Sequence, residues 1–444
     1  MNLKREWPGL SLNDPRLLVL VAAFYILFRL SHRLLKPGAV QIGLILAANL
    51  AIFAYFAPGH VAALFTFVSL SYFCAKSVAR ASLRKANIIT TFYVLVTVAT
   101  LVTFKSSWLG GLSPGWQQWV IPLGYSFILL QNISFVVDSR ACAFGHTWLE
   151  YLAIGTLFAN VTAGPIARPK ELLTQLKAPN LDPGPALALI VSGLFKKSVA
   201  DVLAPHAAFL FSPNVTIAGQ ALALLFLLGQ YYADFSGYTD LARGFGALFG
   251  FNLPENFNLP YFAVNMADYW RRWHMSMSLW FRDYVFFPLE LALFRRFNAS
   301  ASLISLLSLL SVFSLIGLWH GLQWHLLLWG LMNGALVFLA EKYAVFRKGV
   351  FACIVAWIGI ACGEVMIMSD ALTQNAPKNA EAVDVPVLLT LALLGLLLPH
   401  AIDFVQTRKI LTSASVSYYA FYAFCGLMAL LLATKGPSFI YAGF

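Results

Sequence analysis

Long runs without a charged residue alternate with short charged clusters along this chain. The segments Ala86–Phe104, Asn214–Ala233 and Ile410–Thr434 carry no charged side chain. Each is long enough to cross about 30 Å of hydrocarbon as a helix. The longest run, Ala299–Ala340, contains two histidines as its only titratable groups. Such runs predict membrane-spanning helices, because lipid leaves backbone polar groups unsatisfied outside helices and barrel strands alternate instead.

The apolar runs together predict about eleven to thirteen passes, some of them tilted or re-entrant. We place them at 17–30, 39–59, 61–75, 86–104, 119–137, 147–165, 186–203, 214–233, 301–318, 322–340, 350–368, 386–402 and 410–434. Leu17–Phe28 has the length of a signal-peptide core, but Arg29 and the helices that follow favour a first membrane pass. The sequence therefore predicts an all-α polytopic membrane protein.

Composition agrees with this class, and the charges predict an orientation. Hydrophobic residues make up 60% of the chain and charged residues only 11%, whereas a soluble domain of this length exposes far more charge. Basic clusters without acidic residues lie at 29–36 and 76–85. Two predicted helices separate these clusters, so both lie on one side, which the positive-inside rule makes cytoplasmic. The N-terminus then lies outside, and the net charge of +11 needs no nucleic acid to explain it.

The segment Gly250–Asn298 mixes charges with aromatic side chains, unlike a solvated loop. From about Val264 onward its spacing is helical. One face carries Trp270, Trp273, His274, Met277 and Phe281, and another carries Arg271, Met275, Ser278 and Arg282. Asp268 precedes Arg272 by four residues and is expected to pair with it. The pattern suits either an interfacial helix with snorkelling arginines or a helix that lines a polar cavity.

A second segment, Gly317–Gly334, repeats the same residue types inside the long uncharged run. His320 stands there at membrane depth, where a titratable side chain invites a functional hypothesis. Neutral imidazole is also the natural proton acceptor near neutral pH. Gly317 and Gly321 flank it and allow close backbone approach or a break in the helix. If Arg295–Arg296 lies inside, the next pass runs outward and brings His320 near its outer end. A histidine that only hydrogen-bonds a neighbouring helix is the alternative.

Tryptophans gather in these two segments. Six of the 12 in the chain lie there, namely Trp270, Trp273, Trp280, Trp319, Trp324 and Trp329, which suits the lining of a shaped pocket. His325 lies five residues beyond His320, on a different helical face, and is interpreted as structural. The five cysteines show no CxxC spacing, which favours structural burial. We therefore expect no metal site.

Six ordered motifs run through the middle of the chain. They are Pro122–Phe127 (PLGYSF), Gly164–Arg168 (GPIAR), Tyr232–Asp240 (YADFSGYTD), Pro254–Tyr261 (PENFNLPY), Tyr269–Tyr284 (YWRRWHMSMSLWFRDY) and Gly317–Gly321 (GLWHG). In this order they resemble the bacterial membrane-bound O-acyltransferase (MBOAT) family. The pieces Val136–Arg140 and Ala200–Pro205 resemble its acetyl-transferring branch.

The resemblance implies an MBOAT fold, with transmembrane or re-entrant helices and interfacial helices around a central tunnel. It implies that residues 1–444 form a single integral membrane domain. The motif-bearing core would span about 119–341, with peripheral helices at 1–118 and 342–444. The expected location is the bacterial cytoplasmic (inner) membrane, crossed many times.

The resemblance also implies the site. The histidine of GLWHG corresponds to His320, the expected catalytic histidine, and that of RRWH corresponds to His274, a second functional histidine. Residues expected to bind the donor or line the tunnel are Trp270, Arg271, Arg272, Trp273, Ser276, Trp280, Arg282, Asp283, Trp319 and Asn333. Snorkelling to lipid headgroups is the alternative for the arginines.

One departure from the family pattern concerns Asn333. Family members often carry a histidine here, in WGxxHG, whereas this chain reads Trp329–Gly334 as WGLMNG. Asparagine hydrogen-bonds but does not act as a base near neutral pH. Any role of that third histidine is therefore in doubt in this chain, while His320 and His274 are unaffected.

Within the family, the chain looks most like the alginate O-acetyltransferase membrane subunit. Peptidoglycan and cellulose O-acetyltransferases are similar, and teichoic acid D-alanyltransferases are more distant. The resemblance implies transfer of an acyl group, most simply acetyl, from a cytoplasmic thioester donor to hydroxyls of an extracytoplasmic polysaccharide. The donor would be acetyl-CoA or a phosphopantetheine carrier protein, with no permanently bound cofactor. Transfer would be direct or through an extracytoplasmic partner with a serine esterase-like domain.

Two alternatives remain at this point. D-alanyl transfer from a carrier protein to a teichoic-acid-like polymer needs the same chemistry and a different donor. A proton-coupled transporter or flippase would also contain many passes, a midplane histidine and interfacial arginines. That class predicts inverted repeats, which the sequence does not show, and leaves the order of the motifs unexplained.

Overall fold

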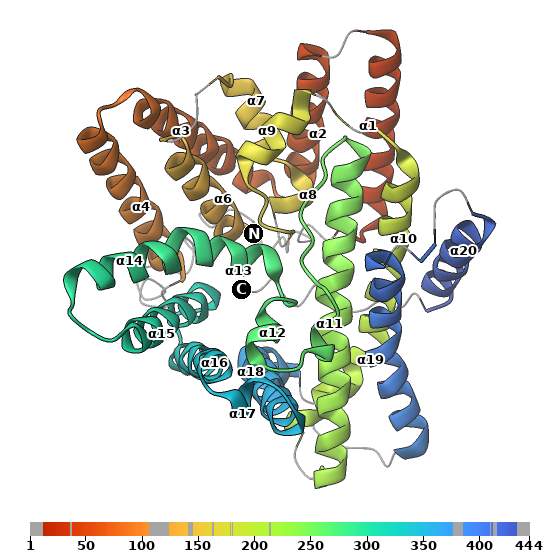
Figure 1. The fold of residues 1–444 in the computed structure, drawn as a ribbon. Coiled ribbons are helices and arrows are strands. Elements are labelled where there is room, and N and C mark those ends of the chain that lie inside the picture. The colour runs from red at the N-terminus through yellow and green to blue at the C-terminus, as the bar shows by residue number, and fades with distance from the viewer. Residues whose placement is uncertain are drawn as a thin grey trace, which may run out of the picture. The chain divides into compact units, whose positions relative to one another are not determined.

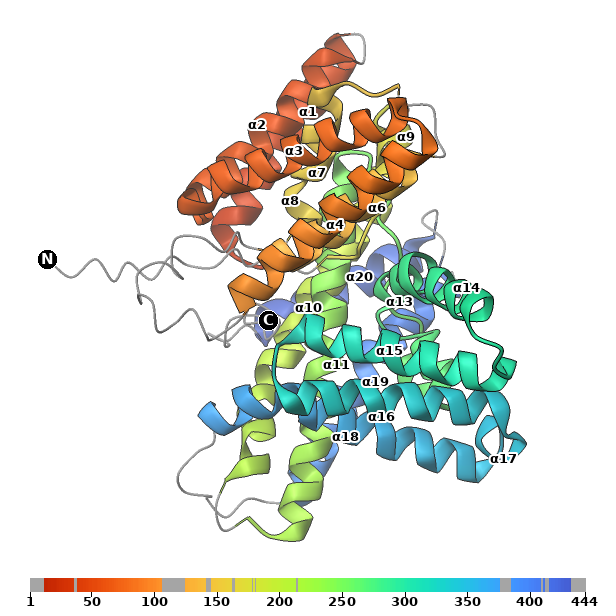
Figure 2. The same ribbon diagram turned by 90° about the vertical axis from the view of Figure 1, so that its left-hand side faces the viewer.

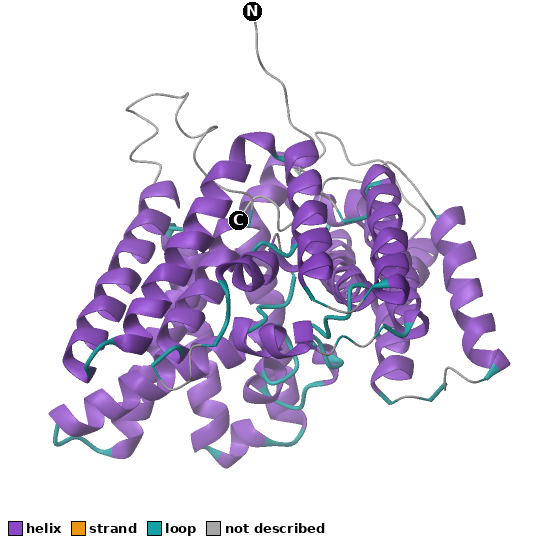
Figure 3. Cartoon of the chain, turned by 90° about the horizontal axis from the view of Figure 1, so that it is seen from above, coloured by secondary structure: helices purple, strands orange, loops and turns teal. Residues whose placement is uncertain are grey.

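The computed structural model describes residues 12–35, 38–105, 124–140, 145–161, 164–177, 179, 181–212, 215–375, 385–408, 410–411 and 415–432. Over these residues the chain is built from helices and contains no strand (Figure 3). The all-α class is therefore confirmed. Pro122 and Leu123 of the first predicted motif and the start of the predicted pass at 119–137 lie outside the described residues.

The helices group into two compact units. The first comprises Met1–Ile190 with Leu241–Pro254, and the second comprises Val191–Asp240 with Glu255–Phe444. Two long helices, α10 (Pro183–Ala207) and α11 (Ile217–Leu248), contribute residues to both units. The second unit contains the described parts of four of the motifs, and the candidate site lies within it.

The first unit is built from helices, most of which are apolar (Figure 1). They are α1 (Pro15–Leu34), α2 (Ala39–Phe56), η1 (Pro58–His60), α3 (Val61–Arg80), α4 (Leu83–Lys105), α6 (Tyr125–Asp138), α7 (Trp148–Gly155), α8 (Phe158–Val161) and α9 (Pro169–Lys177). The local sequence explains where several of these helices begin. Asp14 caps α1 by accepting the Arg16 amide at 2.8 Å, and Thr147 with Glu150 forms a capping box on α7.

The second unit continues with short helices in the aromatic segment and then long apolar ones. They are η3 (Ala208–Phe211), η4 (Pro260–Phe262), α12 (Met266–Trp270), α13 (Met275–Phe281), a π turn (Arg282–Phe286), α14 (Phe287–Arg296), α15 (Ala301–His320), α16 (Trp324–Lys342), α17 (Ala344–Arg347), α18 (Val350–Asn375), α19 (Val385–Thr407) and α20 (Val416–Leu431). Figure 2 shows α15, α16 and α18 side by side.

Glycines bring α15 and α16 into unusually close contact. A Cβ atom on Gly317 would lie 2.1 Å from the carbonyl oxygen of Leu326, and one on Gly330 would lie 2.3 Å from that of Phe313. Only glycine permits this approach of two helix backbones. The expectation of close backbone approach at Gly317 is therefore confirmed, and the contact fixes the end of α15 that bears His320.

Eight helices of the described residues are long and apolar enough to span a membrane, fewer than the predicted eleven to thirteen. They are Pro15–Leu34, Ala39–Phe56, Pro58–Arg80, Leu83–Thr103, Ala301–His320, Trp324–Lys342, Val350–Ser369 and Leu388–Thr407. Two shorter apolar helices, α6 and α20, lie at 119–137 and 410–434. The predicted pass at 147–165 is divided into α7 and α8. The helix α10 covers 186–203, and α11 covers 214–233 from Ile217 onward, but both carry buried charges that lower their hydropathy.

Candidate active site

The aromatic segment does not form the continuous helix that its spacing predicts. α12 ends at Trp270, and α13 begins only at Met275. Between them His274 adopts a left-handed backbone conformation, with φ of 42°. Such a conformation is uncommon for a residue other than glycine and costs free energy unless the surroundings hold it in place. The interruption therefore needs a structural cause outside the turn itself.

That cause is Asn256, in the motif that precedes the turn. Its side-chain oxygen accepts hydrogen bonds from the Ser276 amide at 3.2 Å, the Ser276 hydroxyl at 2.8 Å and Nδ1 of His274 at 3.1 Å. Its backbone carbonyl accepts the Met275 amide at 2.9 Å. Asn256 also donates to the Thr239 hydroxyl at 3.5 Å. Residues of three motifs, which are distant in the sequence, thus meet at one buried amide.

These contacts define the protonation of His274. The Ser276 amide can only donate, so the Asn256 atom that it contacts is the oxygen, and Nδ1 of His274 must carry a proton to bond to it. Nε2 is then the basic nitrogen. The ring is fully buried, with the Phe235 ring perpendicular to it at 4.9 Å between centroids. Burial lowers the pKa of His274 to about 3, so the imidazole is neutral at physiological pH.

His320 ends α15 at the second turn. Gly321 follows in an extended conformation and closes the helix. The imidazole is 4% exposed and lies against two indoles, with centroid distances of 4.8 Å to Trp319 and 5.7 Å to Trp329. Trp319 packs in turn on Phe281 of α13 at 6.5 Å. Aromatic packing and the glycine contact between α15 and α16 therefore hold His320.

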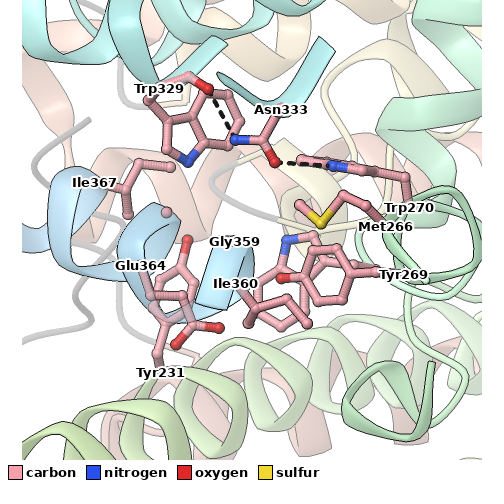
Figure 4. A pocket seen from close by; sticks show the side chains of 12 residues that line it. Tyr231, Met266, Tyr269, Trp270, Trp329, Asn333, Gly359, Ile360, Glu364 and Ile367 are labelled. Atoms are coloured by element: carbon pink, nitrogen blue, oxygen red, sulfur yellow. Dashed lines mark hydrogen bonds between the residues drawn. The ribbon is translucent and has the colours of Figure 1, made fainter. Parts of the chain in front are cut away.

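A small pocket of about 20 Å³, room for about one water molecule, lies between α11, α12, α16 and α18 (Figure 4). Trp270 donates to the side-chain oxygen of Asn333 at 3.1 Å, and Asn333 donates to the Trp329 carbonyl at 2.8 Å. The pocket is lined by Tyr231, Met266, Tyr269, Trp270, Trp273, Trp329, Asn333, Gly359, Ile360, Gly363, Glu364 and Ile367. Trp329 borders the pocket and also contacts His320. Through these hydrogen bonds Asn333 links α12 to α16. An amide can make both bonds, and neither requires a base.

The structure brings only some of the predicted site residues to this pocket. Trp270, Trp273 and Asn333 line it. The Ser276 hydroxyl donates a hydrogen bond to Asn256. The buried Trp280 ring packs on the Phe281 ring, with 5.1 Å between the ring centroids. The charged members lie near the surface in ion pairs, which join Arg272 to Asp268 at 2.9 Å, Arg271 to Asp268 at 3.9 Å and Arg282 to Asp283 at 2.8 Å. The predicted pairing of Asp268 with Arg272 is confirmed.

Glu364 is a pocket residue that the sequence analysis missed. It lies on α18 and is 4% exposed, and one carboxylate oxygen accepts the Tyr261 hydroxyl at 2.5 Å. Burial, and next the charge of Glu364, raise the pKa of Tyr261 well above its ordinary value, so that hydroxyl remains a donor. The signal was a single acidic residue inside the otherwise apolar run 350–368. Nothing local to that run indicated its partner.

A buried ion network was also missed. Lys196 of α10 pairs with Asp240 at 2.7 Å and with Asp403 of α19, and Lys197 pairs with Asp234. Asp234 and Asp240 belong to the YADFSGYTD motif, so this motif serves to neutralise two buried lysines. The adjacent lysines in an apolar helix were the available signal. Among the residues that the structure describes, no group of three or more acidic, histidine or cysteine side chains could hold a metal ion.

Comparison with known proteins gives a match over the middle of the chain. Residues 132–353, half of the chain, match the model of the membrane-bound O-acyltransferase family. A probable alginate O-acetylase of Azotobacter vinelandii is 34% identical over 222 residues, which cover 48% of this chain and 43% of that protein.

Two further relatives are named for different activities. A peptidoglycan O-acetyltransferase of Helicobacter pylori is 32% identical over 278 residues, covering 54% of this chain and 51% of the relative. A teichoic acid D-alanyltransferase of Streptococcus thermophilus is 28% identical over 227 residues, covering 48% of this chain and 55% of the relative. The chain thus matches about half the length of these curated relatives.

Proposed function

Because this chain belongs to the membrane-bound O-acyltransferase family, we propose that it transfers an acyl group from a thioester to a hydroxyl of a cell-envelope polysaccharide. Acetyl is the proposed group, since the alginate and peptidoglycan relatives, which are 34% and 32% identical over 48% and 54% of this chain, are named for O-acetylation. Acetyl-CoA or an acylated phosphopantetheine carrier protein is the proposed donor. Transfer is direct or through an extracytoplasmic serine esterase-like partner.

His320 is the proposed general base. The hydroxyl oxygen of the acceptor attacks the thioester carbonyl carbon while an imidazole nitrogen of His320 takes the hydroxyl proton. The carbon–sulfur bond then breaks, the thiolate leaves, and the proton passes from the imidazolium to the sulfur. A hydroxyl is a weak nucleophile at its own pKa, and such a base typically contributes about 10²–10⁴-fold to the rate.

The observation that carries this proposal is the position of His320. It stands at the end of a membrane-length helix, beside a pocket wall, in the motif that the family match covers. His274 is proposed as a positioning residue, because its protonated nitrogen is bound to Asn256 and its ring is fully buried. Its neutral side chain supports the turn between α12 and α13 that presents Trp270 and Trp273 to the pocket.

We further propose that the protein lies in the bacterial cytoplasmic membrane with Arg295–Arg296 and Arg347–Lys348 inside. His320 then lies toward the outer face. The thioester would arrive from the cytoplasm and the acceptor from outside, through a central tunnel. Arg271, Arg272 and Arg282 are proposed to hold anionic groups of the donor near its entrance.

Thioester turnover by the purified protein in detergent tests the proposal. Acetyl-CoA, a D-alanyl carrier protein and longer acyl-CoAs are compared, and the His320→Ala variant serves as the blank. Release of free CoA from acetyl-CoA that depends on His320 supports the acetyl branch. Turnover of the carrier-bound D-alanyl group alone would move the assignment to D-alanyl transfer, and turnover of no thioester would contradict the function.

A further inference from the structure

A second pocket lies within the first unit and shares no residue with the candidate active site. Its volume is about 230 Å³, which exceeds that of an apolar cavity of about 150 Å³ that holds a benzene ring. Its walls come from α1, α2, α7 and α9 and from residues shortly after α9 and α11, and α1 and α2 lie side by side (Figure 1). All the lining residues belong to this unit. They are Phe28, Gly38, Gln41, Ile42, Ile45, Glu150, Leu176, Pro179 and Phe249.

This pocket has an apolar floor and an open rim. Phe28, Ile45 and Phe249 are at most 2% exposed, and the Phe28 and Phe249 rings meet edge to face with 5.5 Å between their centroids. Gly38 is exposed at the rim, where an added Cβ atom would meet nothing within 4 Å. None of the described lining residues is basic, and Glu150 contributes a carboxylate. The pocket therefore suits an apolar group and disfavours an anion.

Gln41 supplies a hydrogen-bond donor that the fold does not use. Its side-chain oxygen accepts the Gly38 amide at 2.6 Å, and because that amide can only donate, the other side-chain atom is the nitrogen. Gln41 is 5% exposed, and its Nε2 has no partner among the residues that the structure describes. A buried donor without an acceptor is unfavourable. A carbonyl oxygen that enters the pocket would therefore stabilise this group.

The pocket lies at the depth of the ester groups of a bilayer. The turn between the membrane-length helices Pro15–Leu34 and Ala39–Phe56 belongs at the membrane boundary. Gln41 lies two residues into the second of these helices, or about 3 Å, and Ile45 lies six residues in, or about 9 Å. The polar region of each leaflet is roughly 5–8 Å thick. Gln41 therefore lies within the polar region, and Ile45 reaches the hydrocarbon.

We propose that this pocket binds a diester phospholipid whose headgroup carries an ammonium group. An ester carbonyl oxygen accepts a hydrogen bond from Nε2 of Gln41, and the first methylene groups of that chain fill the space over Phe28, Ile45 and Phe249. The ammonium group faces the Glu150 carboxylate. The rest of the lipid stays in the bilayer. This site goes beyond the proposed acyl transfer and does not depend on it.

The charges around the pocket distinguish this lipid from an acyl donor. Coenzyme A and phosphopantetheine both carry phosphate, and the Glu150 carboxylate repels an anion inside the pocket. A zwitterionic headgroup avoids this conflict, because its ammonium lies at the carboxylate and its phosphate stays at the boundary. Arg33, in the last turn of α1, is exposed and places a positive charge at that boundary. In a membrane, phospholipid also surrounds α1 and α2 at high concentration.

Lipid binding measured on the whole chain, without any acyl donor, tests this inference. The protein is freed of co-purified lipid in detergent, and native mass spectrometry measures the apparent Kd of the first lipid bound. The probes are dioleoyl phosphatidylethanolamine, its diether analogue, which lacks both ester carbonyls, and dioleoyl phosphatidylglycerol, whose headgroup is anionic. We expect wild-type protein to bind the diester phosphatidylethanolamine about tenfold more tightly than either of the other lipids.

Two variants alter the two parts of the site. Gln41→Glu keeps an oxygen for the Gly38 amide and replaces the donor by an acceptor. It should bind the diester about tenfold more weakly and no longer distinguish it from the diether. Ile45→Phe fills the floor and should weaken the binding of both. Gln220→Glu and Val40→Phe make matched changes at exposed residues outside the pocket, so these controls should bind like wild type.

Three results would overturn the site. They are equal binding of the diester and the diether by wild-type protein, binding by Gln41→Glu and Ile45→Phe as tight as by wild type, and phosphatidylglycerol bound as tightly as phosphatidylethanolamine. Equal losses in the two controls would likewise contradict it. Because no thioester enters the measurement, a protein that binds the lipid but cleaves no thioester would contradict only the proposed function.

Discussion

The two histidines of the site are held by different means. His274 is fixed by a hydrogen bond to Asn256, in a left-handed turn between two short helices. His320 is fixed by packing, at the end of a 20-residue helix whose glycine contacts its neighbour. The first imidazole is fully enclosed, whereas the second lies against a tryptophan that also borders the pocket.

We infer from this difference that His274 holds the site in shape and that His320 is suited to react in it. The interior hydrogen bond to His274 determines which nitrogen carries the proton, and burial keeps the ring neutral. Packing of α15 against α16 and against two indoles instead positions His320. The same residue type is therefore proposed to serve structure in one motif and chemistry in the other.

Removing the support of His274 should have the largest effect on stability. Asn256→Ala deletes the oxygen that accepts from His274 and from two donors of Ser276. We expect the free energy of unfolding to fall by about 3 kcal/mol, because several buried donors lose their acceptor. Thermal unfolding in detergent measures the change. Asn256→Asp keeps an oxygen acceptor and should lose less, and equal losses would contradict the assignment.

Disturbing the packing around His320 should have a somewhat smaller effect. Gly317→Ala places a Cβ atom 2.1 Å from a backbone oxygen, so α15 and α16 must separate. Overpacking of this kind costs about 1–3 kcal/mol, and we expect acyl transfer to fall with stability. In Gly321→Ala the new atom meets the ends of two flexible side chains, Leu326 at 2.7 Å and Gln323 at 3.3 Å. That control should be milder, and the reverse order would contradict the packing account.

The pH dependence of stability should report His274. Its pKa is lowered from 6.5 to about 3 in the folded protein. Between pH 6.5 and 3 the unfolded chain therefore binds a proton on His274 that the folded chain does not bind. The contribution of His274 to the free energy of unfolding is fully present above pH 6.5 and declines as the pH falls toward 3. In the variant His274→Asn, the new asparagine tolerates the left-handed backbone conformation, and its side-chain amide still donates a hydrogen bond to Asn256. Unfolding midpoints of His274→Asn should thus fall less between pH 7.5 and 4.5 than those of wild type, and parallel curves would exclude this titration.

The smallest change in stability is expected for Arg282→Ala. The arginine side chain is half exposed and pairs with Asp283 on the surface, and exposed pairs contribute about 0–1 kcal/mol. If Arg282 binds the donor, the KM for acetyl-CoA should rise severalfold while kcat and the unfolding midpoint stay close to wild type. An unchanged KM would favour interaction with lipid headgroups instead.

Much of the framework around His320 could be predicted from the sequence. The uncharged run, with Gly317 and Gly321 on either side of His320, indicated paired helices and close backbone approach. The spacing of Asp268 and Arg272 indicated their ion pair. These features are local, because residues within one helix or one turn determine them.

Features that depend on distant residues could not be predicted in this way. The helix breaks at His274 because Asn256, 18 residues upstream, forms a hydrogen bond with this residue. The charge of the buried Lys196 is balanced by Asp240 of α11 and by Asp403, which approaches from α19. Glu364 was visible as a lone acid, but its link to Tyr261 and to the pocket required the tertiary fold.

The most direct test of the contrast is acetyl-CoA cleavage by His320→Ala and His274→Asn, measured side by side with thermal unfolding. We predict that His320→Ala loses at least about 100-fold in kcat while its unfolding midpoint stays near that of wild type. His274→Asn should keep kcat within about tenfold, as expected for a positioning residue. Cleavage retained by His320→Ala, and abolished in a well-folded His274→Asn protein, would contradict the account.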